Sequence, residues 1–198
     1  MKTAFVGRDF EIRIGVATNR QESTYIGTYP RLEFSRFSTR TSFINATFED
    51  TLWLPPETSI HAAKTVLNWM GWHINQDDSP PIPHPDMFED ALELWAAAKA
   101  FEIKLMYRTG LRVALKQYVR GAALTLAEFR LVWEKTRDSE IQQAAISGLI
   151  FRHGDGQRYG FEGVPERRFI VAYAETRNIR IGWMPAKVES RRQTGNGK

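Results

Sequence analysis

The chain has 198 residues, 42% hydrophobic and 25% charged, and these values are typical of one globular domain with a sizeable core. It contains no cysteine, which excludes disulfide scaffolds, thiol catalysis and cysteine-based zinc sites. The net charge of +4 invites a nucleic-acid hypothesis, but the charges are spread along the chain. No signal-like segment begins the sequence and no run approaches about 18 apolar residues, so we expect a soluble intracellular protein, cytoplasmic or nuclear.

Apolar and polar residues alternate over residues 10–14, which predicts a half-buried strand. After a polar turn, residues 24–29 predict the return strand of a hairpin. Pro30 should end this strand, because proline cannot donate to a β-ladder. The spacing of apolar residues in 31–48 fits short helical turns better than alternation, and residues 51–54 predict a short strand.

Beyond this strand the sequence is mainly helical. Ser59 is expected to cap a helix, and residues 75–85, rich in proline, predict a loop. The apolar stripe expected for this helix consists of Ile60, Ala63, Leu67 and Met70. A further helix is predicted over 104–120, with Gly121 just beyond its end.

Three capping-box patterns predict three more helix starts. The pairs are Asp86 with Glu89, Thr125 with Glu128, and Ser139 with Gln142. The first of these helices has apolar residues on two faces and should be buried on both sides. The last should end before Gly154, because the following Asp-Gly pair is typical of a turn.

The final stretch allows two interpretations. Pro165 could begin a helix running to about residue 177, which we favour, while the composition of residues 169–173 also suits a strand. Beyond residue 184 the chain is predicted to be a disordered basic tail. Its charged residues are Lys187, Glu189, Arg191, Arg192 and Lys198.

No residue pattern indicates catalysis or metal binding. No two histidines have the helical or hairpin spacing of metal ligands, and nucleophile-elbow and P-loop patterns are missing. His73 and His84 flank two aspartates, but in a proline-rich loop these side chains are expected to be solvated. We therefore expect no catalytic residues, no cofactor and no metal.

Three parts of the chain resemble motifs of the BTB/POZ domain family. The strand at 51–55 and the helix ending in 66–72 resemble the family's strand followed by "FLxWLY", and 91–101 resembles its "LYxLADKFxI" helix. Residues 131–142 are similar to the "IYxxTPxxSxLRxLLVD" run of the fungal BTB-like members.

This resemblance implies an α/β (α+β) fold, with a small mixed sheet, a cluster of α-helices and a C-terminal helical extension. It divides the chain into a BTB/POZ-like domain at 8–120, a BACK-like extension at 121–184 and the tail at 185–198. Many animal members have an extra N-terminal helix that swaps between subunits. About nine residues precede Phe10, too few for that helix, so a swapped homodimer is not expected.

The function implied is that of a non-catalytic protein–protein interaction module: an adaptor, scaffold or oligomerisation domain that binds another protein or itself. The candidate partner-binding residues are aromatic side chains in or next to the predicted helices. They are Trp69, Trp72, Trp95, Phe101, Tyr107 and Tyr118. Each Trp could instead be a core residue. Two alternatives stay open: a substrate adaptor of a cullin-type ubiquitin ligase, and a nucleic-acid-associated regulatory factor. We expect no small-molecule substrate and no membrane association.

Overall fold

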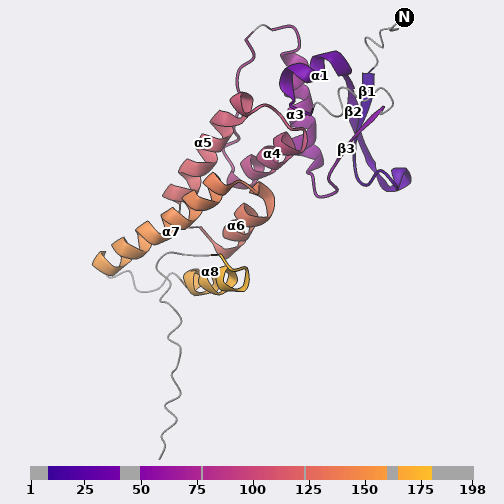
Figure 1. The fold of residues 1–198 in the computed structure, drawn as a ribbon. Coiled ribbons are helices and arrows are strands. Elements are labelled where there is room, and N and C mark those ends of the chain that lie inside the picture. The colour runs from indigo at the N-terminus through magenta and orange to yellow at the C-terminus, as the bar shows by residue number, and fades with distance from the viewer. Residues whose placement is uncertain (1–8, 41–49, 77, 123, 160–164, 180–198) are drawn as a thin grey trace, which may run out of the picture.

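The computed structural model describes residues 9–40, 50–76, 78–122, 124–159 and 165–179. A small sheet forms one end of the molecule, and the helices extend away from it (Figure 1). The fold is therefore mixed α/β, as the sequence predicts. Among the described helices, none is both long enough and apolar enough to cross a membrane.

Three strands form the sheet in the order β2-β1-β3. β1 (Asp9–Ile14) and β2 (Thr24–Pro30) form the predicted antiparallel hairpin, joined through a short 3₁₀ helix, Arg20–Glu22. β3 (Thr51–Leu54) pairs with β1 in parallel. The apolar residues of β1 are buried and their neighbours are more exposed, which confirms the predicted alternation.

A parallel strand pair needs a crossover connection, and helix α1 (Arg31–Phe37) lies in the connection between β2 and β3. This confirms helical turns for the first part of residues 31–48; residues 41–49 lie outside the described residues. Helix α3 (Ile60–Trp72) follows β3 and contacts β2. Its first turn is capped by Ser59, whose hydroxyl accepts a hydrogen bond from the Ala62 amide at 3.4 Å.

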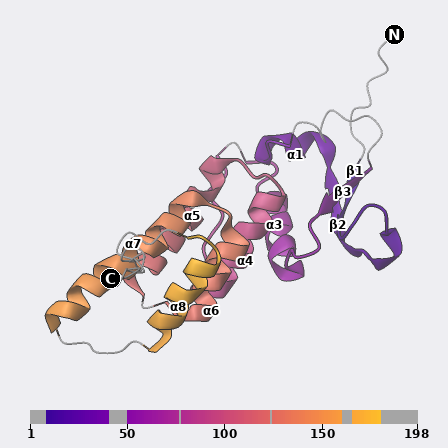
Figure 2. The same cartoon turned by 60° about the horizontal axis from the view of Figure 1, so that its bottom comes forward.

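The remaining elements are helical. They are α4 (Phe88–Ala100), α5 (Leu105–Gly121), α6 (Leu126–Leu131), a π-helix (Val132–Thr136), α7 (Ser139–Tyr159) and α8 (Pro165–Thr176). α5 packs lengthwise against α7, and α8 lies beside α6 (Figure 2). The helical interpretation of the final stretch is thereby confirmed for Pro165–Thr176.

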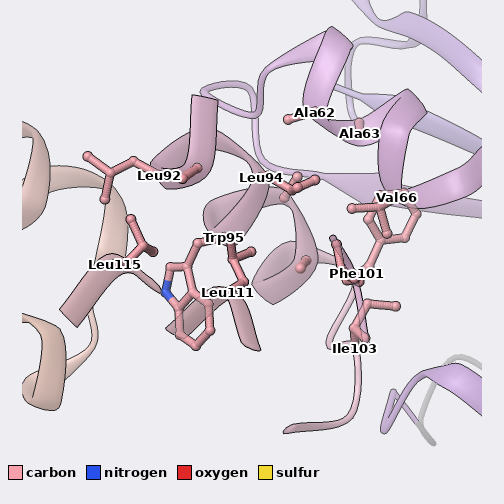
Figure 3. Packing of buried hydrophobic residues seen from close by; sticks show 14 of the residues in the cluster. Ala62, Ala63, Val66, Leu92, Leu94, Trp95, Phe101, Ile103, Leu111 and Leu115 are labelled. Atoms are coloured by element: carbon pink, nitrogen blue, oxygen red, sulfur yellow. The ribbon is translucent and has the colours of Figure 1, made fainter. Parts of the chain in front are cut away.

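Helix α4 lies at the centre of the core, buried on two sides as predicted. Figure 3 shows Leu94 and Phe101 directed toward Val66 of α3, while Trp95 lies toward Leu111 of α5. One buried cluster extends from the sheet through α4 to α6, α7 and α8. The core is thus continuous across the boundary between residues 120 and 121. This is the boundary at which the family resemblance divides the chain into a domain and an extension. The basic tail lies outside the described residues.

Two of the three predicted capping boxes do not form. Thr125 and Glu128 bond reciprocally, as predicted. The N-cap of α4 is Met87 rather than Asp86, so the predicted pair is out of register by one residue. Asp138, not Ser139, caps α7, because its Oδ1 accepts hydrogen bonds from the amides of residues 140 and 141 at 3.0 and 3.1 Å.

Two further predictions about helix ends are wrong, and a third, about the buried stripe of α3, is right only in part. Gly121 is the last residue of α5 rather than a left-handed residue beyond it, since the next amide still bonds to the Tyr118 carbonyl at 2.8 Å. α7 continues through Gly154 to Tyr159, because glycine permits a turn without requiring one. In the expected stripe of α3, Ala63 and Met70 are buried and Leu67 is partly buried. Ile60 is 45% exposed, and the buried residues are Ala62, Ala63, Val66, Trp69 and Met70.

Candidate interaction surfaces

Four of the six aromatic residues predicted to bind a partner lie in the core. These buried residues are Trp69, Trp95, Phe101 and Tyr107. Tyr118 is half-buried and Trp72 is 76% exposed. Among the six, only Trp72 therefore presents most of its side chain to a partner in this conformation.

Trp69 lies in an aromatic cluster where three helices meet. Its ring centroid is 5.2 Å from that of Phe37 in α1 and 5.3 Å from that of Tyr107 in α5. The His73 ring lies 5.8 Å away, just beyond the end of α3. The indole N–H is buried and has no hydrogen-bond partner among the described residues. The role of Trp69 and Tyr107 is to hold α1, α3 and α5 together.

Trp95 joins α4 to the π-helix and to α5. Its Nε1 donates to the Thr136 carbonyl oxygen at 3.4 Å, and the Arg108 guanidinium lies 5.1 Å from its ring centroid. Burial lowers the pKa of Arg108 from its ordinary value. Phe101 follows directly after α4 and is also buried, and Ser38 donates a hydrogen bond to its carbonyl at 2.7 Å.

Tyr118 joins α5 to two neighbouring helices. Its ring stacks on Phe88 of α4, with centroids 4.1 Å apart and planes within 9°. Its hydroxyl donates to Glu128 Oε1 of α6 at 2.8 Å, and this bond is the main cause that raises the Tyr118 pKa. Because these contacts lie within the domain, they indicate that Tyr118 packs helices together rather than binding a partner.

The exposed Trp72 lies at the last position of α3, at the end of the helical cluster where α5 begins. The amide of Lys104 bonds to the Phe37 carbonyl at 2.8 Å, so α5 begins where α1 ends. Arg36 of α1 donates to the carbonyl of Ile74, two residues after Trp72, at 2.9 Å. The ends of α1 and α3 and the start of α5 therefore lie at one end of the helical cluster.

Leu105 and Met106, in the first turn of α5, are 50% and 65% exposed. Together with Trp72 they form what we call the Trp72 surface. Sequence reasoning did not select these two residues. One signal could have found Leu105 and Met106: both are apolar, yet both lie off the stripe of α5 residues that packs into the core. The residues of this stripe are Tyr107, Leu111, Leu115 and Val119.

A second surface lies where α4, the π-helix and the segment after β3 meet. A hollow of about 210 Å³ is lined there by Ala96 and Ala100, by the cations Lys99, Lys135 and Arg137, and by the acidic residues Glu57 and Glu134. Lys99 Nζ donates to the carbonyl of Thr136 at 3.3 Å and to that of Arg137 at 3.0 Å. Lys99 thus fixes the end of the π-helix against α4.

Within the described part of the chain, no three His, Asp or Glu side chains are grouped to hold a metal ion. His73 Nδ1 is 2.6 Å from Gln76 Oε1, and Asp77 lies outside the described residues.

Comparison of the chain with models of known families, with curated proteins and with solved structures found no match.

Proposed function

We propose that this chain is a non-catalytic protein–protein interaction module with a BTB/POZ-like fold, serving as an adaptor, scaffold or oligomerisation domain. The observation that carries the proposal is the exposure of Trp72 at the end of α3, at the same end of the helical cluster as the exposed Leu105 and Met106 of α5. A large indole left in water at the junction of three helices is the kind of residue that anchors an interface.

The order of the elements supports the BTB/POZ-like part of the proposal. An antiparallel hairpin is followed by α1, by a strand parallel to β1, and then by α3 against the sheet. The helices α4 and α5 then pack on one another and on the C-terminal helices. The residue patterns predicted this order of elements, although not the parallel pairing of β3 with β1.

Energetics favour Trp72 as an anchor. Burying one large apolar side chain is worth roughly 1.5–3 kcal/mol, and interface anchors often cost 2 kcal/mol or more when truncated. Trp72 makes no ring contact with a described aromatic residue, so its removal should leave the fold intact.

Affinity purification of the wild-type chain and of Trp72→Ala, followed by quantitative mass spectrometry, tests the proposal. Lys64→Ala, on an exposed position of the same helix, is the matched control. We expect at least one stoichiometric protein partner that is retained by the control and lost by Trp72→Ala. A cullin among the retained proteins would favour the ubiquitin-ligase alternative.

The proposal fails if only nucleic acid or metabolites are recovered, or if Trp72→Ala retains every partner of the wild type. Light scattering of the purified chain tests self-association in the same way. An oligomer formed through the Trp72 surface should dissociate in Trp72→Ala but not in Lys64→Ala.

A further inference from the structure

Helix α5 carries an unusual charge pattern. No acidic residue occurs between Glu102 and Glu128, while cations recur at every fourth position of this stretch. These cations are Lys104, Arg108, Arg112, Lys116 and Arg120. Residues four apart lie on neighbouring turns of one helix face, so the middle three form a basic strip along α5.

Two cations from other elements lie beside this strip. Lys99 of α4 bonds to the carbonyl oxygens at the end of the π-helix, and Arg137 follows directly after that helix. Arg108 donates from Nε to the Ile103 carbonyl at 2.6 Å and lies over the Trp95 ring. We call Lys99, Arg108, Arg112, Lys116 and Arg137 the cationic cluster.

Two carboxylates lie among these five cations. Glu140 pairs with Arg112, and with Lys116 at 2.8 Å. Asp138 caps α7 by accepting the amide hydrogens of residues 140 and 141. Lys99, Arg108 and Arg137 have no carboxylate within ion-pair distance among the described residues. The cluster therefore holds an excess of positive charge.

The pKa values of two of these groups are consistent with mutual repulsion. Burial lowers the pKa of Lys99, and the nearby Arg108 and Arg137 lower it further, against the attraction of Asp138. Burial also lowers the pKa of Arg108, and Arg112 adds to this effect. Crowded, partly desolvated cations of this kind are stabilised by an incoming anion.

The shape of the cluster favours a protein segment over a nucleic acid. Arg108 to Lys116 covers only about 12 Å of helix, whereas nucleic-acid sites follow several phosphates and stack bases on exposed aromatic rings. The aromatic ring at the cluster is that of Trp95, which is fully buried. The neighbouring hollow is lined by Ala96 and Ala100 but also by Glu57 and Glu134, so an acidic segment would lie on the cluster rather than enter the hollow.

We propose that the cationic cluster binds an acidic segment of a protein partner, with its carboxylates on Arg137, Lys99 and the α5 strip. The inference rests on the proposed function in that the partner is a protein, but it does not depend on the Trp72 surface. The two surfaces contact a partner independently.

A fluorescein-labelled decapeptide of alternating Glu and Gly is the probe, and fluorescence anisotropy at low and at physiological ionic strength measures its binding. Removing one exposed charge contact is worth up to about 1 kcal/mol, so Arg137→Gln should weaken binding by about fivefold at low salt. Arg120→Gln removes the same charge one turn beyond Lys116 and about 18 Å from Arg108 along α5, so at physiological ionic strength, where charges are screened over about 8 Å, it should weaken binding less than Arg137→Gln does. Glu140→Gln should strengthen binding.

The inference is overturned if the wild type does not bind the decapeptide, or if Arg137→Gln and Arg120→Gln weaken binding equally, since net charge alone would then explain it. It is also overturned if a single-stranded DNA of equal charge binds more tightly and depends on Arg137. Circular dichroism shows that each variant is folded. Loss of partner capture in Trp72→Ala, with no decapeptide binding by the wild type, would leave the proposed function standing and this inference refuted.

Discussion

Replacing Trp95 by alanine should destabilise the domain severely, because this side chain is fully enclosed between α4, α5 and the π-helix. Truncating a buried tryptophan costs about 3–5 kcal/mol through lost burial and the cavity left behind. The hydrogen bond from Nε1 to Thr136 is long, at 3.4 Å, and adds little. For a domain of this size each kcal/mol lowers the melting temperature by about 2–4 °C, so a decrease of about 6–20 °C is expected.

Urea unfolding followed by far-ultraviolet circular dichroism measures this change. Trp72→Ala is the matched control, because it removes the same side chain from an exposed position and should change the unfolding free energy by no more than about 0.5 kcal/mol. Equal stability of the two variants would refute the assignment of Trp95 to the core. Loss of partner binding by a fully stable Trp95→Ala would instead favour the role that the sequence suggested.

Three more predictions concern local features, each measured by thermal or urea unfolding. Thr125→Ala removes the N-cap of α6 and should cost about 1 kcal/mol, with Thr125→Ser restoring most of it. Gly15→Ala should cost about 1–3 kcal/mol, because φ is +143° and the new Cβ would lie 3.0 Å from Ser23 Cβ; an unchanged midpoint would contradict this. Burial alone would raise the Glu128 pKa, but hydrogen bonds from Thr125 and Tyr118 outweigh it and lower this pKa. The resulting stabilisation is present above the unfolded-state pKa of about 4.3 and is lost as pH falls through the folded-state value. Glu128→Gln should therefore destabilise the chain at neutral pH and make little difference in strong acid, whereas an equal effect at both pH values would oppose this reasoning.

Features that depend on local pattern could be predicted from the sequence. The alternation in residues 10–14 predicted β1, and the Thr125 box formed because its hydroxyl and the Glu128 carboxylate satisfy amides within one turn. The two-sided burial of α4 followed from apolar residues on both of its faces.

Features set by contacts between distant residues could not be predicted. Phe88 stacks on Tyr118, thirty positions away, and α4 begins at Phe88 rather than one residue earlier. Asp138 and Ser139 were equally good N-caps by residue type, and the sequence alone did not distinguish them. The buried side of α3 faces both the sheet and α4, so it is centred on Val66 rather than on the expected stripe.

The same limit applies to the candidate site. Trp69, Trp72 and Trp95 look alike in sequence, since each lies in an apolar helical segment. Trp69 and Trp95 are enclosed by α5, whereas Trp72 lies at the last position of α3, beyond the reach of these contacts. Which tryptophan is exposed depends on where helices end and cross, and periodicity does not carry that information.

Hydrogen–deuterium exchange of the chain, free and in its purified complex or oligomer, tests the central claim most directly. A partner bound at the Trp72 surface should slow amide exchange in peptides covering residues 71–76 and 105–109, while β1 and β2 exchange as in the free chain. A stable complex with unchanged exchange in both peptides would contradict the claim that this surface is the interaction site.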